Sequence, residues 1–370
     1  MQCTITPPTK TQDKNNDNKK IRNSNLELYR IIAMLMIIAH HYVVHGGLVE
    51  KLIEAPFTAS SGAMLLFGAW GKTGINCFVM ITGWFMCKQK FSIQKFTKLY
   101  IQIVFYAVII YGIFCISGNA SFNIVDAVLK LFPIDSVSTH FISCFLVFYL
   151  IIPFICKMIH NMDKQSYKIL LAILLIIYTI LPIFPKYEFS YNYVTWFSVV
   201  FISAAYIRNY GLFDKISHQA WGWITLLLIT ISSVSIIGLM ALFKYGITHA
   251  FLSYWFVRDC NQLLPFAIGI ASFMYFKDLK MPYIRLVNVV GSTTFGILLI
   301  HDNYLMKKWL WQENVDCIGH FSAHLFPTLS YAILSVALVF VLCSGIEWLR
   351  GRLLDEWQNK MISNISRKLA

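Results

Sequence analysis

Long apolar segments recur along the chain and alternate with short polar stretches. Each apolar run has about 18 to 20 residues, the length that an α-helix needs to cross the hydrocarbon core of a bilayer. The pattern therefore predicts an all-α integral membrane protein with about ten transmembrane helices. The predicted spans are residues 26–45, 73–87, 99–117, 140–160, 168–184, 193–210, 220–243, 259–277, 288–306 and 328–348. The apolar segment 57–71 fits an interfacial position before the second span.

The composition indicates that lipid covers much of the folded chain. Of the 370 residues, 57% are hydrophobic and 13% are charged, and the mean hydropathy is +0.61. A soluble domain is usually about one quarter charged. A soluble fold of this length could not hide so much apolar surface, because much of any folded surface faces solvent. The lipid bilayer is therefore the predicted partner of this surface.

The two polar ends of the chain define its predicted domain organisation. Residues 1–22 are rich in Lys, Asn, Gln and Thr, which predicts a disordered basic cytosolic tail. The apolar run that follows is too long for the core of a cleaved signal peptide. We expect residues 23–350 to form the membrane domain and residues 351–370 to form a short cytosolic C-terminal tail.

The net charge of +13 changes the interpretation only slightly. In a soluble protein it would suggest nucleic acid, but here the basic residues lie between apolar runs, so we expect no nucleic-acid partner. If the N-terminus is placed in the cytosol, most of the 31 Lys and Arg residues fall on the cytosolic side, loop after loop. Both termini are therefore predicted to be cytosolic. No internal repeat of the kind found in many secondary transporters is evident.

The first span carries the densest set of ionisable side chains within an apolar run. Such groups are functional candidates, because a charge at the bilayer centre costs about 2.5 to 3.5 kcal/mol on insertion scales. Arg30 and His41 point only about 20° apart and are separated by about 16 Å along the helix axis. His40 points about 80° away from Arg30, and Glu27 can pair with Arg30. The alternatives are a snorkelling anchor for Arg30 and interfacial positions for His40 and His45.

A second intramembrane histidine, His301, falls toward the outer end of the ninth span, at a depth similar to that of His41. Histidine titrates near neutral pH and is the commonest general base. A metal site would need a third ligand, for which Asp302 is the only obvious neighbour, and we expect no metal. The nine cysteines show no metal-ligand spacing, and a disulfide between Cys260 and Cys317 is not supported by their spacing.

Four segments carry a characteristic set of polar and small residues. In chain order they are Arg30 followed after ten residues by His41, the stretch 74–83, the stretch 141–153, and Thr294-Phe295-Gly296 followed by His301. Together they resemble the bacterial membrane acyltransferase 3 family over nearly the whole apolar part of the chain. The ordered set is more specific than any one of the motifs.

The sequence departs from the family pattern at several positions. His140 stands where a Trp is usual, and Asn261 lacks the Ser-Pro that often follows it. Lys95 and Lys98 replace the family's Arg-x-x-Arg element. Lysine lacks the bidentate geometry of the arginine guanidinium, so we expect Lys95 and Lys98 to bind donor phosphates more weakly than two arginines would. The alternative is that the pair serves mainly as a signal for membrane topology.

The resemblance implies transfer of an acyl group, often acetyl in that family, from cytosolic acyl-CoA to a hydroxyl of an exported or cell-surface glycan at the bacterial plasma membrane. It implies His41 as general base, His301 and Arg30 as further catalytic residues, and Lys95, Lys98 and Arg30 as donor-binding residues. The competing functions are a multi-pass transporter or exporter, which would use the same polar groups as a relay, and a noncatalytic scaffold.

Overall fold

The structure, a computed structural model, describes residues 23–134, 140–184, 192–213 and 215–369. The predicted tail of residues 1–22 lies outside the described residues. Every regular element in the described part of the chain is helical. The principal helices are α1 (Ser24–Val44), α2 (Leu48–Glu54), α3 (Ala59–Gly68), α4 (Gly71–Met86), α5 (Ile93–Ile116), α6 (Ile124–Leu129), α7 (Phe141–His160), α8 (Lys164–Leu175), α9 (Tyr193–Tyr210), α10 (His218–Lys244), α11 (Leu263–Asp278), α12 (Arg285–His301), α13 (Tyr304–Lys308) and α14 (Leu325–Leu369).

Seven helical stretches are long and apolar enough to cross a membrane, which supports the predicted multi-pass membrane protein. They are Ser24–Val44, Ala59–Met86, Ile93–Ile116, Phe141–His160, Lys164–Ile183, His218–Lys244 and Leu325–Ile362. Helices α9, α11 and α12 coincide with three further predicted spans but do not meet the same criteria of length and apolarity. The count of ten and the cytosolic location of both termini therefore stay predictions.

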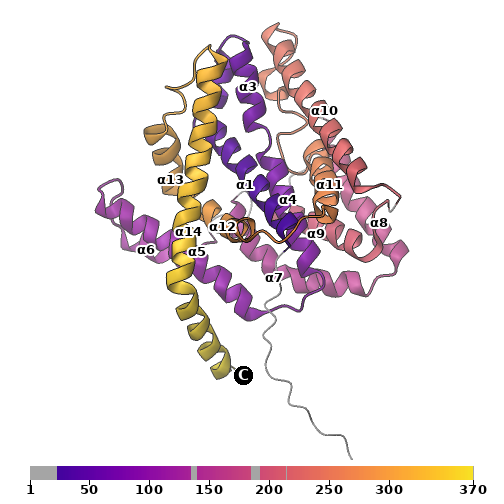
Figure 1. Cartoon of the computed structure of the whole chain (residues 1–370), viewed down its shortest axis with the longest axis vertical. Coiled ribbons are helices and arrows are strands. Elements are labelled where there is room, and N and C mark those ends of the chain that lie inside the picture. The colour runs from indigo at the N-terminus through magenta and orange to yellow at the C-terminus, as the bar shows by residue number, and fades with distance from the viewer. Residues whose placement is uncertain (1–22, 135–139, 185–191, 214, 370) are drawn as a thin grey trace, which may run out of the picture.

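Two segments differ from their predicted form. Residues 57–71, which fitted an interfacial position, instead contribute α3, and α3 and α4 form one apolar stretch, Ala59–Met86. Residues 351–369, which were expected to be a tail, continue α14 without a break. Figure 1 shows α14 extending past the neighbouring helices at its C-terminal end.

Helix α1 lies in the centre of the molecule and packs against α4, α12, α3 and α14 (Figure 1). Glycines of α4 allow close approach to its neighbours. A Cβ atom at Gly74 would lie 2.8 Å from the carbonyl oxygen of Ala33 in α1, and one at Gly83 would lie 2.7 Å from the Cβ of Ala204 in α9. Small residues of this kind let membrane helices pack backbone to backbone.

A peripheral set of helices carries exposed apolar side chains. In α5, α8 and α10, less than a third of the residues in the most apolar window are buried. Their exposed side chains include Ile113, Ile173 and Leu227. An apolar surface of this extent in water would drive association, so we assign it to contact with lipid.

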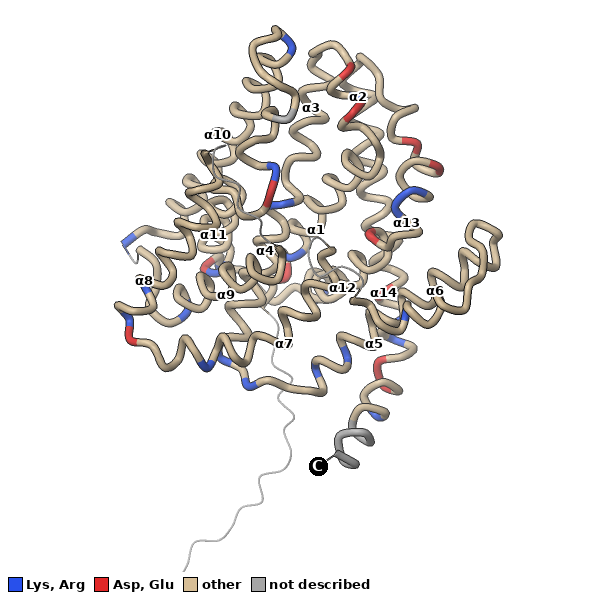
Figure 2. The backbone as a smooth tube through the Cα atoms, turned by 180° about the vertical axis from the view of Figure 1, so that it is seen from behind, with Lys and Arg blue, Asp and Glu red and all other residues tan. Residues whose placement is uncertain are grey.

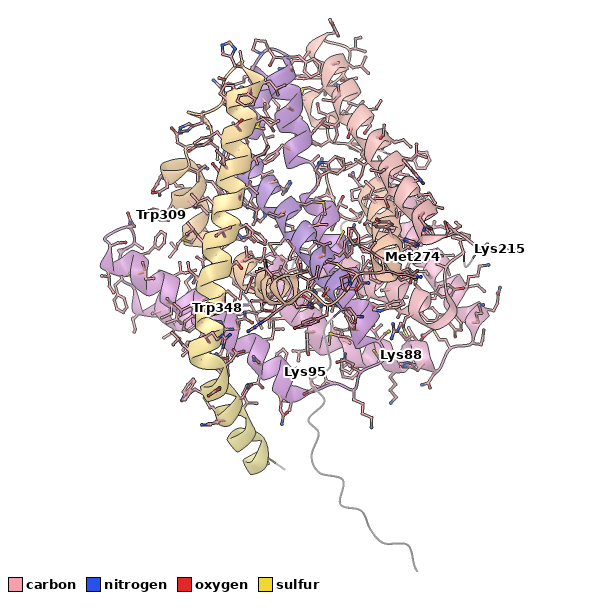
Figure 3. The ribbon with its side chains drawn as sticks, viewed as in Figure 1. Lys88, Lys95, Lys215, Met274, Trp309 and Trp348 are labelled. Carbon is pink, nitrogen blue, oxygen red and sulfur yellow. The ribbon has the colours of Figure 1, made fainter. Side chains whose placement is uncertain are left out.

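Basic residues gather toward one end of the molecule. Figure 2 shows most Lys and Arg residues in the part that also holds the C-terminal end of α14. Lys88 and Lys95 lie at this end in Figure 3. We call it the basic end, and the predicted topology makes it the cytosolic side.

A buried polar network joins α5 to α14 near the basic end. The Glu347 carboxylate accepts hydrogen bonds from Tyr106 at 2.6 Å, from Gln102 at 2.9 Å and from Arg350 at 2.8 Å. Gly296 of α12 makes room for this carboxylate, because a Cβ there would come within 2.4 Å of it. The charge of Glu347 is thus paired and hydrogen-bonded, as burial requires.

Candidate active site

Two histidines from helices far apart in the sequence meet in the interior of the molecule. His41 comes from α1 and His301 from the last turn of α12, and these two helices pack against each other. Their atoms Nδ1 (His41) and Nε2 (His301) lie 3.1 Å apart, which is hydrogen-bond distance. His301 is fully buried, whereas 13% of the His41 side chain is exposed. His41 is therefore the member of the pair that a substrate can reach.

The hydrogen-bond partners assign the tautomers of both rings. Nδ1 of His301 lies 2.6 Å from the carbonyl oxygen of Ile297, and a carbonyl can only accept, so this nitrogen carries the proton. Nε2 of a neutral His301 is then an acceptor, and Nδ1 of His41 must donate to it. A neutral His41 consequently keeps a lone pair on Nε2, which is the atom that can take a proton from a substrate.

Asp302 lies directly after α12 and faces two histidines of α1. Its Oδ1 atom is 3.6 Å from Nδ1 of His41 and 3.4 Å from Nε2 of His45. The same oxygen is 2.9 Å from Nζ of Lys307 in α13. The carboxylate is nearly buried, so its negative charge acts on the neighbouring rings with little screening by water.

A cavity of about 170 Å³ surrounds the exposed edge of His41. Its wall carries basic side chains from several helices, with one carboxylate. The polar and aromatic lining residues are His40, His41, His45, Lys72, His140, Phe141, Tyr193, Asp302 and Lys307. Lys72 donates a hydrogen bond of 2.8 Å to the Tyr193 hydroxyl. This concentration of donors suits a ligand that carries or develops negative charge.

A second, more polar cavity of about 520 Å³ shares Val44, His45 and Lys307 with the His41 cavity. It is lined largely by hydrogen-bonding and aromatic side chains: Asn119, Tyr304, Lys308, Trp309, Gln312 and Glu313. Aromatic rings together with amide and charged groups are the usual means of orienting a polar ligand. This cavity is a candidate site for a polar ligand.

His40 faces a different neighbour from His41. Its Nδ1 lies 2.6 Å from the carbonyl oxygen of Gly68 in α3 and therefore donates to it. Its ring also packs against Gly71, where a Cβ would come within 2.4 Å. The structure thus uses His40 to join α1 to the α3–α4 junction, although the ring still lines the His41 cavity.

Arg30 lies apart from the His41 cavity. Its guanidinium forms an ion pair of 2.8 Å with Glu27, the partner that the sequence predicted. Its guanidinium also lies 6.0 Å from the ring centre of Phe85 in α4. Arg30 is not among the residues that line the cavity around His41. Its predicted roles in catalysis and donor binding stay predictions.

Lys95 and Lys98 lie at the basic end, in the first turns of α5. The Lys95 ammonium donates to the Gln89 side chain at 2.7 Å. The Lys98 ammonium forms an ion pair of 2.8 Å with Asp355 of α14. Any contact of Lys98 with donor phosphates must therefore compete with this carboxylate.

Three side chains at the site are close enough to share a metal ion: the ligand atoms of His41, His45 and Asp302 lie within 4.8 Å of one another. The ammonium of Lys307 lies 2.9 Å from the same Asp302 oxygen and supplies a positive charge there. This ammonium would repel a divalent cation, so the site favours the ion pair between Asp302 and Lys307 over a metal ion.

Cys260 and Cys317 are both buried and do not form a disulfide. Cys317 packs against Gly46 at the end of α1. The Cys260 carbonyl accepts a hydrogen bond of 2.7 Å from Asn76 in α4. The two cysteines therefore serve separate packing roles.

Several residues of the site were not predicted for this purpose. Asp302 was considered only as a metal ligand, while Lys72, Lys307 and Tyr193 had no assigned role. Asp302 and Lys307 belong to the turn after α12 and to α13, and loop geometry does not follow from helical periodicity. The adjacency of Asp302 to an intramembrane histidine was the available signal.

The fold and the site define a multi-pass helical membrane protein with a histidine pair at a basic cavity. A family model described as an acyltransferase domain matches residues 23–348. The chain belongs to the acyltransferase 3 family and is an acyltransferase. No curated protein and no solved structure is significantly similar to it.

Proposed function

We propose that the protein transfers an acyl group, with acetyl as the first expectation, from cytosolic acyl-CoA to a hydroxyl of an extracytoplasmic glycan. We place it in the bacterial plasma membrane. The observation that carries the proposal is the hydrogen-bond chain from the Ile297 carbonyl through His301 to His41. This chain leaves Nε2 of a neutral His41 unprotonated, so this atom can accept a proton.

The chemistry follows from that lone pair. A hydroxyl is a poor nucleophile at neutral pH, and Nε2 of His41 takes its proton as the oxygen attacks the thioester carbonyl. The carbon–sulfur bond then breaks, the ester forms, and the His41 imidazolium returns the proton to the departing thiolate. Asp302, whose Oδ1 is 3.6 Å from Nδ1 of His41, stabilises the transient imidazolium.

The negative charge that develops on the carbonyl oxygen needs a donor within the same cavity. Lys72 is held by the Tyr193 hydroxyl at 2.8 Å, and both line the His41 cavity. We assign Lys72 to stabilising this oxyanion, because a fixed positive charge in a site with little water is effective. The acceptor sugar occupies the polar cavity beside Lys307, where Tyr304 and Trp309 offer aromatic surfaces.

The test uses purified protein in sealed vesicles supplied with acetyl-CoA and candidate glycans. An acyltransferase releases free coenzyme A and forms an acylated glycan, and the release depends on acceptor. A transporter or exporter moves solute and releases no coenzyme A. Solute movement without coenzyme A release, for the unmodified protein and His41→Ala alike, contradicts the proposal.

A further inference from the structure

A third cavity, of about 430 Å³, lies beside the His41 cavity and shares His40, Val44 and Lys72 with it. It lies between the C-terminal end of α1, α2, α3, α10 and the segment 250–259. Its volume falls within the range of about 300 to 1,000 Å³ that is common for small-molecule sites. This 430 Å³ chamber is therefore adjacent to the His41 cavity, with His40 and Lys72 in the walls of both. We call this chamber the apolar chamber.

The wall of the apolar chamber presents mainly carbon atoms. Its aliphatic lining includes Val43, Val49, Ile53, Leu65, Met240 and Val257. The polar side chains of the wall are engaged by the protein: the Tyr254 hydroxyl donates to the Leu65 carbonyl at 3.2 Å, and Ser253 lies 3.8 Å from the Met240 sulfur. The two charged residues of the segment, Arg258 and Asp259, form an ion pair of 3.3 Å with each other. The chamber thus suits an alkyl chain and offers little to a sugar.

The position of the apolar chamber relative to the basic end identifies its occupant. Coenzyme A is expected at the basic end, where Lys95 lies (Figure 3). The apolar chamber lies at the opposite, C-terminal end of α1, beyond His41 as seen from there. In an acyl-CoA, the end of the acyl chain is the part farthest from the nucleotide, so a chain whose carbonyl is at His41 continues into this chamber.

An acceptor lipid fits this place less well. The hydrocarbon tail of a lipid-linked glycan must return to the bilayer interior, whereas the apolar chamber lies at the C-terminal end of α1, away from the middle of that helix. The polar cavity beside Lys307 already provides a separate branch for an acceptor. The three neighbouring cavities are therefore assigned as an acyl branch, a reaction centre and an acceptor branch.

We propose that the apolar chamber binds the acyl chain of the donor, and that the preferred donor carries a short to medium aliphatic acyl chain, which revises the first expectation of acetyl. This inference rests on the proposed acyltransferase function and specifies its donor. Each buried methylene should strengthen binding by about fourfold until the chamber is filled.

The test measures binding of unreactive thioether analogues of acyl-CoA with alkyl chains of two, four, six and eight carbons to the purified full-length protein. We expect Kd to fall by about fourfold per methylene over at least the first additions. Ala250→Leu, which adds volume to the chamber wall, should remove this dependence while leaving the affinity for the two-carbon analogue within about twofold. Val49→Phe is a second chamber-filling variant, in case Ala250→Leu fails to fold.

Ala172→Leu is the matched control, because Ala172 is an exposed residue of α8 that lines a different cavity. A chain-length dependence that survives both filling variants shows that the alkyl group binds elsewhere and overturns the inference. Equal affinity for all four analogues overturns it as well and leaves the acyltransferase proposal intact. If none of the analogues binds, the proposed function itself fails.

A polyprenyl phosphate serves as the second probe. If the filling variants weaken its binding and leave the chain-length dependence of the thioethers unchanged, the apolar chamber belongs to an acceptor lipid and the inference is wrong. The expected outcome is the reverse: the filling variants change thioether binding and leave polyprenyl phosphate binding unchanged.

Discussion

His41 and His301 are 260 positions apart in the sequence, and the contact between their rings, together with the Ile297 carbonyl, determines which nitrogen of each carries a proton. The helical arrangement around His41 also separates it from His40, which donates to the Gly68 carbonyl instead. Two adjacent histidines on one helix thus have different roles: His41 forms part of a hydrogen-bond chain, and His40 joins helices.

His41→Ala should reduce acyl transfer by at least about 10²-fold, since a positioned general base contributes about 10² to 10⁴ in rate. His40→Ala should keep most of the activity and instead lower the thermal stability, because it removes the hydrogen bond to Gly68. The comparison requires initial rates together with membrane insertion and melting temperature for both variants. A dead His40→Ala beside a nearly normal His41→Ala would show that the assignment is reversed, and two nearly normal variants would make His301 the next candidate.

Asp302→Asn tests a positioning role at the same site. The substitution removes the negative charge near His41 and His45 and leaves the Lys307 ammonium without its partner. A transient imidazolium then faces an uncompensated positive charge, and we expect kcat to fall by about 10- to 100-fold, a loss of up to about 3 kcal/mol in a partly screened site. The KM for acyl-CoA should change little.

The double variant Asp302→Asn/Lys307→Met distinguishes this electrostatic role from simple packing. Removing the unpartnered ammonium should restore part of the lost kcat, which a double-mutant cycle measures as a coupling energy. Purely additive losses in the double variant would mean that Asp302 acts on the fold rather than on the charge of His41.

At the scale of helices, α14 is where the sequence was least informative. Hydropathy ended the last span at residue 348, because charged residues become frequent afterwards. The structure continues the helix to Leu369 and uses its charged part for contacts with α5, among them the ion pair between Asp355 and Lys98. Pairing between distant helices satisfies charges that a local hydropathy scan can only count.

The first turns of α5 carry Lys95 and Lys98, the residues predicted to bind acyl-CoA. Lys95→Gln/Lys98→Gln should raise the KM for acyl-CoA by about two- to 30-fold, since two exposed charge contacts contribute roughly 0.2 to 1 kcal/mol each. Protein level and kcat should stay near normal. Lys90→Gln, an exposed lysine in the preceding loop, is the control for charge loss alone. An unchanged KM in the double variant would reduce Lys95 and Lys98 to markers of membrane orientation.

For the whole molecule, apolar periodicity was sufficient to predict the helical membrane fold and the placement of two histidines at similar depth. The predicted pairing of Glu27 with Arg30 is present, because a three-residue spacing on one helix fixes it. The buried Glu347 network, the α3–α4 junction and the approach of Asp302 to α1 could not be predicted. They depend on tertiary packing and on turns, which one sequence does not determine.

The number of membrane spans can be tested by finding the side of the membrane on which two distant positions lie. Seven predicted spans separate residue 90 from residue 313, so the two positions should face opposite sides of the membrane. Three of these spans correspond to α9, α11 and α12, whose 18, 16 and 17 residues extend only about 24 to 27 Å. The hydrocarbon core is about 30 Å thick, so each of the three must be accommodated by local thinning of the bilayer or by its flanking residues.

Glu313→Cys should react with a membrane-impermeant maleimide added to intact cells, since this side chain is 49% exposed and follows α13 at the predicted outer face. Lys90→Cys should react only after permeabilisation, because it lies in an exposed loop between Lys88 and Lys95 at the basic end, which the excess of Lys and Arg assigns to the cytosol. The unmodified chain corrects for its native cysteines, of which Cys115 and Cys156 are partly exposed. Labelling of both variants from the same side would mean that an even number of spans separates them, and one of the three short helices would then not cross the membrane. The reverse pattern, Lys90→Cys from outside and Glu313→Cys only after permeabilisation, would keep the count and invert the orientation.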